Sequence, residues 1–161
     1  MDFSRVIAKL EKASEGFDGL DAQAGWFEQA QYEDGTKAAY VAAIQEFGAP
    51  EKNIPPRPFM RPAVEENKDY WIDELKNGVK AVSLGRMDAD MVMDAIGQRM
   101  ANDVQHAITQ VVSPPLKQST INARLRNKKN KTMTTTLAKP LEDTFYMIDN
   151  VRHAVIKDAA D

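Results

Sequence analysis

Apolar residues recur every three or four positions in three long segments of the chain, which is the spacing that places them on one face of a helix. This pattern predicts helices over residues 3–16, 63–84 and 88–112. The positions that carry it are Phe3, Val6, Ile7, Leu10, Trp71, Leu75, Val79, Val82, Val92, Ile96, Met100, Val104, Ile108 and Val111. Because only the residues GRMD join the last two helices, we expect them to form an antiparallel hairpin.

Strands are predicted near both ends of the chain. The segment AQAGWFEQAQY (22–32) has two central aromatic residues and no helical stripe, and the turn signal Asp34-Gly35 follows it. NVRHAVI (150–156) predicts a terminal strand, and the β-branched TMTTTL (132–137) a further one. We therefore expect an α+β fold, in which a small, largely antiparallel sheet packs against the long antiparallel helix pair, with an N-terminal helix. At least one strand pairing must be long-range.

The alanine-rich segment TKAAYVAAIQEF (36–47) predicts a short helix. Tyr40, Ile44 and Phe47 would share one face of this helix, and Gly48 stands where a left-handed residue commonly ends a helix. Residues 141–148 predict another short helix or turn.

Composition indicates one soluble globular domain over residues 1–161, since 43% of the residues are hydrophobic and 28% are charged. No apolar run approaches the roughly 18 residues that a membrane span needs, and the N-terminus does not resemble a secretory signal. With 0 cysteines, the chain has no disulfide, thiolate nucleophile or cysteine metal site.

Charge is distributed unevenly along the chain. Residues 114–139 contain seven cations and no acid, and removing these charges from the net charge of −3 leaves about −10 on the rest. Residues 116–131 are expected to hold one or two helical turns before a basic loop or arm that spans about 117–139. Three alternatives are open for this arm. It is a loop exposed to solvent, or it contacts the acidic body of another copy of the chain, or it contacts DNA phosphates. Its candidate contact residues are Arg124, Arg126, Lys128, Lys129 and Lys131.

A search for catalytic motifs finds no phosphate loop, no dinucleotide fingerprint and no nucleophile elbow. His106 and His153 stand outside any metal-binding spacing. The alternative, a hydrolase with a metal at His106, would use Asp103 on the same helix. We expect instead a protein that is not an enzyme and binds no cofactor or metal.

Five of the 8 prolines fall within EFGAPEKNIPPRPFMRP (46–62). Proline fixes φ, removes a backbone donor and extends the residue before it, so this stretch predicts a stiff extended passage at a sheet edge. Phe59 would face the core, and Arg57 and Arg61 would lie on the same side of the strand as each other. These two arginines either close the fold internally or contact a partner.

The same region resembles a segment shared by the neck and tail-completion proteins of lambdoid and Mu-like tailed bacteriophages. Their pattern runs Y-x-D-G, an alanine-rich stretch, E-F-G and then I-P-x-R-P-F-[FLM]-R. The matching residues are Tyr32, Asp34, Gly35, Glu46, Phe47, Gly48, Ile54, Pro55, Arg57, Pro58, Phe59, Met60 and Arg61. Those that match a second block, P-L-x-x-S-T and K-P-L-x-D-T, are Pro115, Leu116, Ser119, Thr120, Lys139, Pro140, Leu141, Asp143 and Thr144. Phe145 stands where the family usually has glycine, and the resemblance covers roughly residues 22–157.

The resemblance implies a structural virion protein at the phage neck or head-proximal tail end, made in the bacterial host cytoplasm. Such a protein completes or terminates the tail and joins it to the head. The implied partners are other copies of itself in a ring, expected to be hexameric, the neighbouring connector and tail-tube proteins, and DNA passing through the lumen; no membrane is involved. The residues implied to be structural are Glu46, Phe47, Gly48, Pro55, Pro58 and Phe59. The competing hypothesis is a DNA-binding accessory protein that uses residues 117–131.

Overall fold

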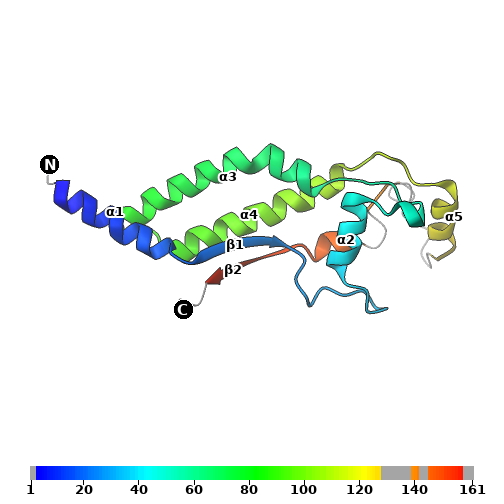
Figure 1. Cartoon of the computed structure of the whole chain (residues 1–161), viewed down its shortest axis with the longest axis horizontal. Helices are drawn as coiled ribbons and strands as arrows, with labels where there is room; N and C mark the ends of the chain where they lie inside the picture. Colours follow the sequence, from blue (N-terminus) through cyan, green and yellow to red (C-terminus); the bar gives the residue numbers. More distant parts are fainter. Residues whose placement is uncertain (1–2, 128–138, 142–144, 158–161) are drawn as a thin grey trace. The chain divides into compact units, whose positions relative to one another are not determined.

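The computed structural model describes residues 3–127, 139–141 and 145–157. The fold is α+β, as expected: α3 and α4 pack closely as a helix pair, an N-terminal helix precedes them, and β1 and β2 form a two-stranded antiparallel sheet (Figure 1). The elements are α1 (Phe3–Phe17), β1 (Leu20–Gly25), α2 (Ala38–Phe47), the 3-10 helix η1 (Pro50–Lys52), α3 (Met60–Ser83), α4 (Ala89–Gln110), α5 (Gln118–Asn127), α6 (Tyr146–Asp149) and β2 (Arg152–Lys157).

The chain divides into two compact units. Unit 1 comprises Met1–Ala24, Glu66–Asn102 and Arg152–Asp161, and unit 2 comprises Gly25–Glu65 and Asp103–Val151. The long helices α3 and α4 each contribute residues to both units. The expectation of one domain over residues 1–161 stays a prediction.

Unit 1 contains the sheet, whose strands come from the two ends of the chain and lie side by side (Figure 1). The long-range strand pairing expected from the sequence is thus confirmed. Glycines allow its elements to approach closely. A Cβ atom on Gly78 of α3 would stand 2.2 Å from a methyl group of Val92 on α4. A Cβ atom on Gly97 of α4 would stand 3.1 Å from the imidazole of His153 on β2.

The apolar stripe of α4 forms much of the core, as predicted. Val92, Ile96, Val104 and Ile108 are all buried, and Ile108 is fully so. The stripe of α1 behaves differently, because Ile7 and Leu10 are each 52% exposed while Ala13 is buried. The apolar pattern of α1 therefore predicted the helix correctly, but Ile7 and Leu10, which belong to that pattern, are not buried.

The predicted strand over residues 22–32 is wrong in its boundaries, because β1 ends at Gly25. Gly25 has a φ of +153°, which turns the chain out of regular strand geometry. Trp26 then joins the core of unit 2: its indole N–H donates to the Met147 carbonyl at 2.7 Å. Its ring also packs against Phe59 in a T-shaped arrangement, with 5.7 Å between the ring centroids. Trp26, one of the two aromatic residues that suggested a strand, thus serves side-chain packing beyond it.

The predicted short helix over residues 36–47 is confirmed as α2, but the predicted apolar face is not the buried one. Tyr40 and Phe47 are exposed, whereas Ala38, Ala42 and Glu46 are buried. Small alanine side chains let the backbone of α2 lie close to the rest of unit 2.

The helical turns predicted in residues 116–131 and 141–148 are present as α5 and α6. The strand predicted over residues 132–137 lies outside the described part of the chain.

The proline stretch is not an edge strand. Residues 55–59 belong to no strand, and α3 begins at Met60, three residues before the predicted helix start. Arg61 therefore lies in the first turn of a helix, and it does not share the side of a strand with Arg57. Pro62 occupies the same first turn, where proline is tolerated because no helical partner exists for its missing N–H group.

Candidate binding site

The start of α3 is held by a carboxylate from the end of α2. Glu46 is only 4% exposed. The backbone N–H groups of Phe59 and Met60 donate to its Oε2 atom at 2.7 and 2.9 Å, and the N–H of Arg61 donates to Oε1 at 3.3 Å. Because Pro62 has no N–H group, residues 59–62 leave no backbone donor without a partner. The regular helical bonding then begins with the N–H of Ala63, which donates to the carbonyl of Phe59.

Charge strengthens this cap. The Nε atom of Arg61 lies 2.9 Å from Oε1 of Glu46, and the Arg61 guanidinium stands 5.5 Å from the ring centre of Phe47. Burial pulls the pKa of Glu46 upward, but the hydrogen bonds from Phe59, Arg61 and Met60 outweigh it and leave the pKa below its ordinary value of 4.5. Glu46 is therefore ionised at the positive end of the α3 dipole, where negative charge is stabilising.

Gly48 allows the chain to turn between the two helices. Its φ is +78°, as the predicted helix-ending role requires, but its ψ of 172° extends the chain away from left-handed helical geometry. A Cβ atom here would stand 2.9 Å from the backbone nitrogen of Pro56. Residue 48 thus has two reasons to be glycine, the positive φ and the close approach of the proline stretch.

Arg57 is a buried cation, with 5% of its surface exposed. Its Nε atom donates to the Pro114 carbonyl at 2.9 Å and one Nη atom donates to the Pro115 carbonyl at 3.3 Å. Burial, and then the positive charge of Arg124, lower the pKa of the Arg57 guanidinium. Arg57 and Arg61 both make contacts inside unit 2, and the hypothesis that they meet another subunit stays a prediction.

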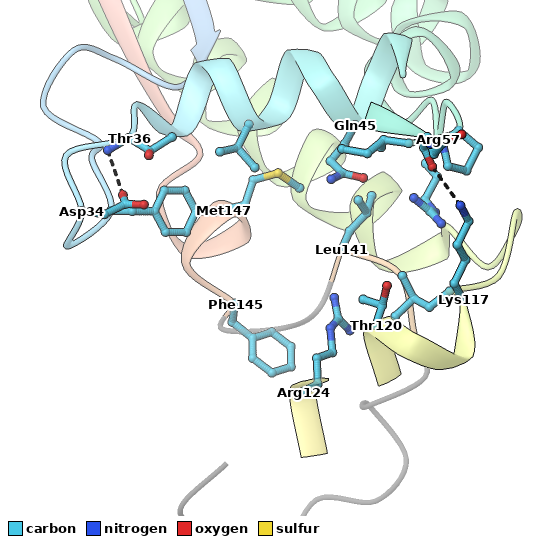
Figure 2. A pocket seen from close by; sticks show the side chains of 16 residues that line it. Asp34, Thr36, Gln45, Arg57, Lys117, Thr120, Arg124, Leu141, Phe145 and Met147 are labelled. Carbon is cyan, nitrogen blue, oxygen red and sulfur yellow. Dashed lines mark hydrogen bonds between the residues drawn. The ribbon is translucent and has the colours of Figure 1, made fainter. Parts of the chain in front are cut away.

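Beside Arg57 lies a pocket of about 580 Å³, within the range of small-ligand sites. All of its lining residues belong to unit 2. They come from three stretches of sequence: the loop and helix from Tyr32 to Arg57, the segment from Leu116 to Arg124, and the segment from Leu141 to Met147 (Figure 2). The walls combine charged groups with apolar side chains. This pocket is the candidate binding site.

The predicted contact residues of the basic arm divide into three groups. Arg124 lines the pocket, and one of its Nη atoms donates to the Lys139 carbonyl at 2.9 Å. Arg126 is exposed on α5 and does not line the pocket. The predicted contacts Lys128, Lys129 and Lys131 lie outside the described residues, as do Asp143 and Thr144 of the second resemblance block.

The remaining signature residues have varied environments. Phe59 is 1% exposed and lies in the core, as expected. Pro55 is half-buried and lines the pocket, whereas Pro58 and Phe47 are exposed, Phe47 to 67%. Sequence reasoning did not identify the capping role of Glu46 or the place of Lys117 in the pocket. The sequence feature that could have indicated the capping role of Glu46 is its position at the end of one predicted helix, shortly before the segment Pro-Phe-Met-Arg-Pro (58–62) that leads into the next.

In the part of the chain that the structure describes, no group of three histidine, cysteine, aspartate or glutamate side chains lies together as a metal site would require. None of the helices described there has an apolar stretch that could span a lipid bilayer.

Comparisons of the chain with protein-family models, with curated proteins and with solved structures find no match.

Proposed function

We propose that this chain is a structural, non-enzymatic virion protein of a tailed bacteriophage, located at the neck or the head-proximal end of the tail. It completes or terminates the tail and joins it to the head, and it acts as a ring of identical subunits that contacts the neighbouring connector and tail-tube proteins. DNA passing through the ring lumen is a further contact in this proposal.

The observation that carries the proposal is the role of the signature residues in unit 2. Glu46 caps the helix that begins after Pro58, and Arg61 pairs with Glu46. Gly48 permits the turn between these residues, and Phe59 lies in the core. Residues shared with a structural family would be expected to serve folding and assembly in this way, whereas residues shared with an enzyme family would surround a reacting group.

The proposal is tested by comparing phage particles assembled with and without the protein, using electron microscopy of purified virions. We expect particles without it to have abnormal tail ends or tails that are not joined to heads. Supplying the wild-type chain from a plasmid should restore normal particles, which controls for effects on neighbouring genes. Normal tails joined to full heads in its absence would contradict the proposal.

The competing proposal is a DNA-binding accessory protein that uses residues 117–131. Lys117 and Arg126 are exposed, so they are accessible to a phosphate backbone. Counterion release predicts that duplex binding through several lysines and arginines falls steeply as salt rises. We expect no such binding by the unassembled subunit, because the leading proposal has DNA contacted only in the lumen of the ring. Duplex affinity of the subunit that declines steeply with salt would favour this competitor.

A further inference from the structure

The helix α2 in unit 2 is apolar on both of its faces. Its sequence is AAYVAAIQEF, in which Glu46 is the only charged residue. The face that carries Ala38, Ala42 and Glu46 is buried, and Glu46 caps α3 there. The opposite face follows the helical spacing i, i+3, i+4 and i+7. Its residues, which we call the α2 stripe, are Tyr40, Ala43, Ile44 and Phe47.

The α2 stripe is open to solvent. Phe47 is 67% exposed and Tyr40 is 55% exposed, with Ala43 exposed and Ile44 half-buried between them. A helix that is apolar on all sides is normally covered on all sides, and aromatic residues are enriched where proteins meet one another. The α2 stripe is therefore a surface that a partner is expected to cover.

A cation stands beside each aromatic ring of the α2 stripe. The Nζ atom of Lys52 lies 5.7 Å from the ring centre of Tyr40 and donates to its hydroxyl at 3.3 Å. The guanidinium of Arg61 lies 5.5 Å from the ring centre of Phe47. These cations fit a partner that presents acids beside apolar residues. A nucleic acid fits less well, because its affinity grows with the number of phosphates neutralised, and Arg61 is already paired with Glu46.

The same chain presents such a surface on the part of α3 that belongs to unit 1. Four residues of α3 have the same spacing as the α2 stripe and share one face over about 10 Å. These residues, which we call the α3 acidic face, are Glu66, Asp69, Tyr70 and Asp73. All four are exposed, and the neighbouring Ile72 is 49% exposed. Asp73 pairs with Lys76 of α3 at 2.8 Å. One chain thus exposes two stripes of equal length and complementary chemistry.

We propose that the α2 stripe of one copy docks on the α3 acidic face of a second copy. Tyr40 and Phe47 are the aromatic anchors, and Lys52 faces the acids of the other copy. The contact joins unlike surfaces, because pairing two α2 stripes would bring their cations together and pairing two α3 acidic faces would bring their acids together. Such a head-to-tail contact closes into a ring when its rotation allows. The inference rests on the proposed function in taking a copy of the same chain as the partner.

The first test is sedimentation velocity of the full chain at rising concentration. The wild type should associate, and Phe47→Ser should weaken the association about tenfold or more, because a central aromatic anchor is lost. Leu84→Ser, at a residue that is 51% exposed outside both stripes, is the matched control and should leave association unchanged. Circular dichroism checks that both variants are folded. A wild type that stays monomeric, or an equal loss in both variants, overturns the proposal.

The second test identifies the two surfaces by mixing variants. Glu66→Lys with Asp69→Lys disables the α3 acidic face, and this variant and Phe47→Ser should each associate weakly alone. Their mixture should form a 1:1 complex that grows no further, because one intact stripe then meets one intact acidic face.

Glu11→Lys with Glu15→Lys makes the same charge change at exposed positions of α1 and should leave association unchanged. Absence of the 1:1 complex, or an equal loss in the α1 variant, overturns the proposal. Both tests measure association in solution, whereas the proposed function is tested on phage particles, so failure of one is distinguishable from failure of the other.

Discussion

Glu46 is an acid inside unit 2, and three backbone N–H groups and one arginine side chain converge on its carboxylate. Replacing it by glutamine keeps the shape of the side chain but removes the charge and turns an N–H₂ group toward backbone donors. We expect Glu46→Gln to lower the free energy of unfolding by about 1.5–3 kcal/mol, the usual range for hydrogen bonds to charged groups. Urea unfolding measures this. Glu65→Gln, at an exposed position of α3, is the matched control and should change the free energy by much less.

The same carboxylate makes a specific prediction about pH. Since the pKa of Glu46 is lower in the folded chain than its ordinary value of 4.5, the unfolded chain binds a proton first as the pH falls. The contribution of Glu46 to stability is therefore complete above about pH 4.5 and is lost as the pH falls toward the folded-state pKa.

Urea unfolding at a series of pH values should show the wild type approaching Glu46→Gln in stability as the solution is acidified. Asp34, whose pKa is lowered chiefly by the backbone hydrogen bond from Thr36, contributes in the same direction. It is present in both proteins, so it cancels in the comparison. A stability difference that stays constant down to low pH would rule out an ionised Glu46 as the cap.

Gly48 provides a second test at the residue scale. Alanine at this position must adopt a positive φ, which costs about 1–3 kcal/mol, and its Cβ must also stand 2.9 Å from the Pro56 nitrogen. Gly35 has a similar φ of +82° with nothing within 4 Å of its Cβ position, so Gly35→Ala measures the cost of a positive φ without a close contact. The ψ of 172° at Gly48 and the close approach to Pro56 both add to the cost there. We therefore expect Gly48→Ala to lower the midpoint of thermal unfolding clearly more than Gly35→Ala. Equal effects would mean that neither feature adds to the cost.

At the scale of elements, the sequence gives the long helices and terminal strands well, because their apolar periodicity is local. It fails where a distant residue decides the boundary. The prolines around Phe59 predict a stiff extended passage before a helix that begins at residue 63, but Glu46 supplies the partners that let α3 begin at Met60. Similarly, β1 ends early because Trp26 packs against Phe59, which lies in another segment. The pocket was not predictable either, since three separate stretches contribute its walls.

The packing of α3 on α4 in unit 1 depends on the absence of a side chain at residue 78. A Cβ atom there would overlap a methyl group of Val92 at 2.2 Å. Gly78→Ala should therefore destabilise the protein by about 1–3 kcal/mol, although alanine is the better helix former.

A double-mutant cycle identifies the cause of that loss. Val92→Ala alone removes buried methyl groups and should also destabilise, but the combination with Gly78→Ala should cost less than the sum of the two, since the alanine Cβ then has room. We expect a coupling of about 0.5–3 kcal/mol from urea unfolding of the four proteins. Additive effects would indicate that α3 and α4 shift apart rather than meet at this point.

At the scale of the whole molecule, the uneven charge is the feature with the widest consequence. Residues 114–139 carry seven cations and no acid. Since the whole chain has a net charge of −3, the remaining residues together carry about −10. Part of this charge faces the pocket through Lys117, which is exposed, and Arg124, which is half-buried. A chain with both signs of charge in separate regions is suited to head-to-tail association, in which the basic segment of one copy meets the acidic surface of the next.

If such association builds the proposed ring, it must weaken with salt, because the Debye length falls from about 10 Å at 0.1 M to about 3 Å at 1 M. Sedimentation velocity at rising salt should show oligomers dissociating. Replacing Lys128, Lys129 and Lys131 by glutamine should reduce association at low salt. The matched control replaces Lys9, Lys12 and Lys80, which lie outside the basic segment and change the net charge by the same amount. Since the control makes the acidic region more negative, it should leave association intact or strengthen it. An equal loss of association in both variants would mean that net charge, and not the basic segment, determines association.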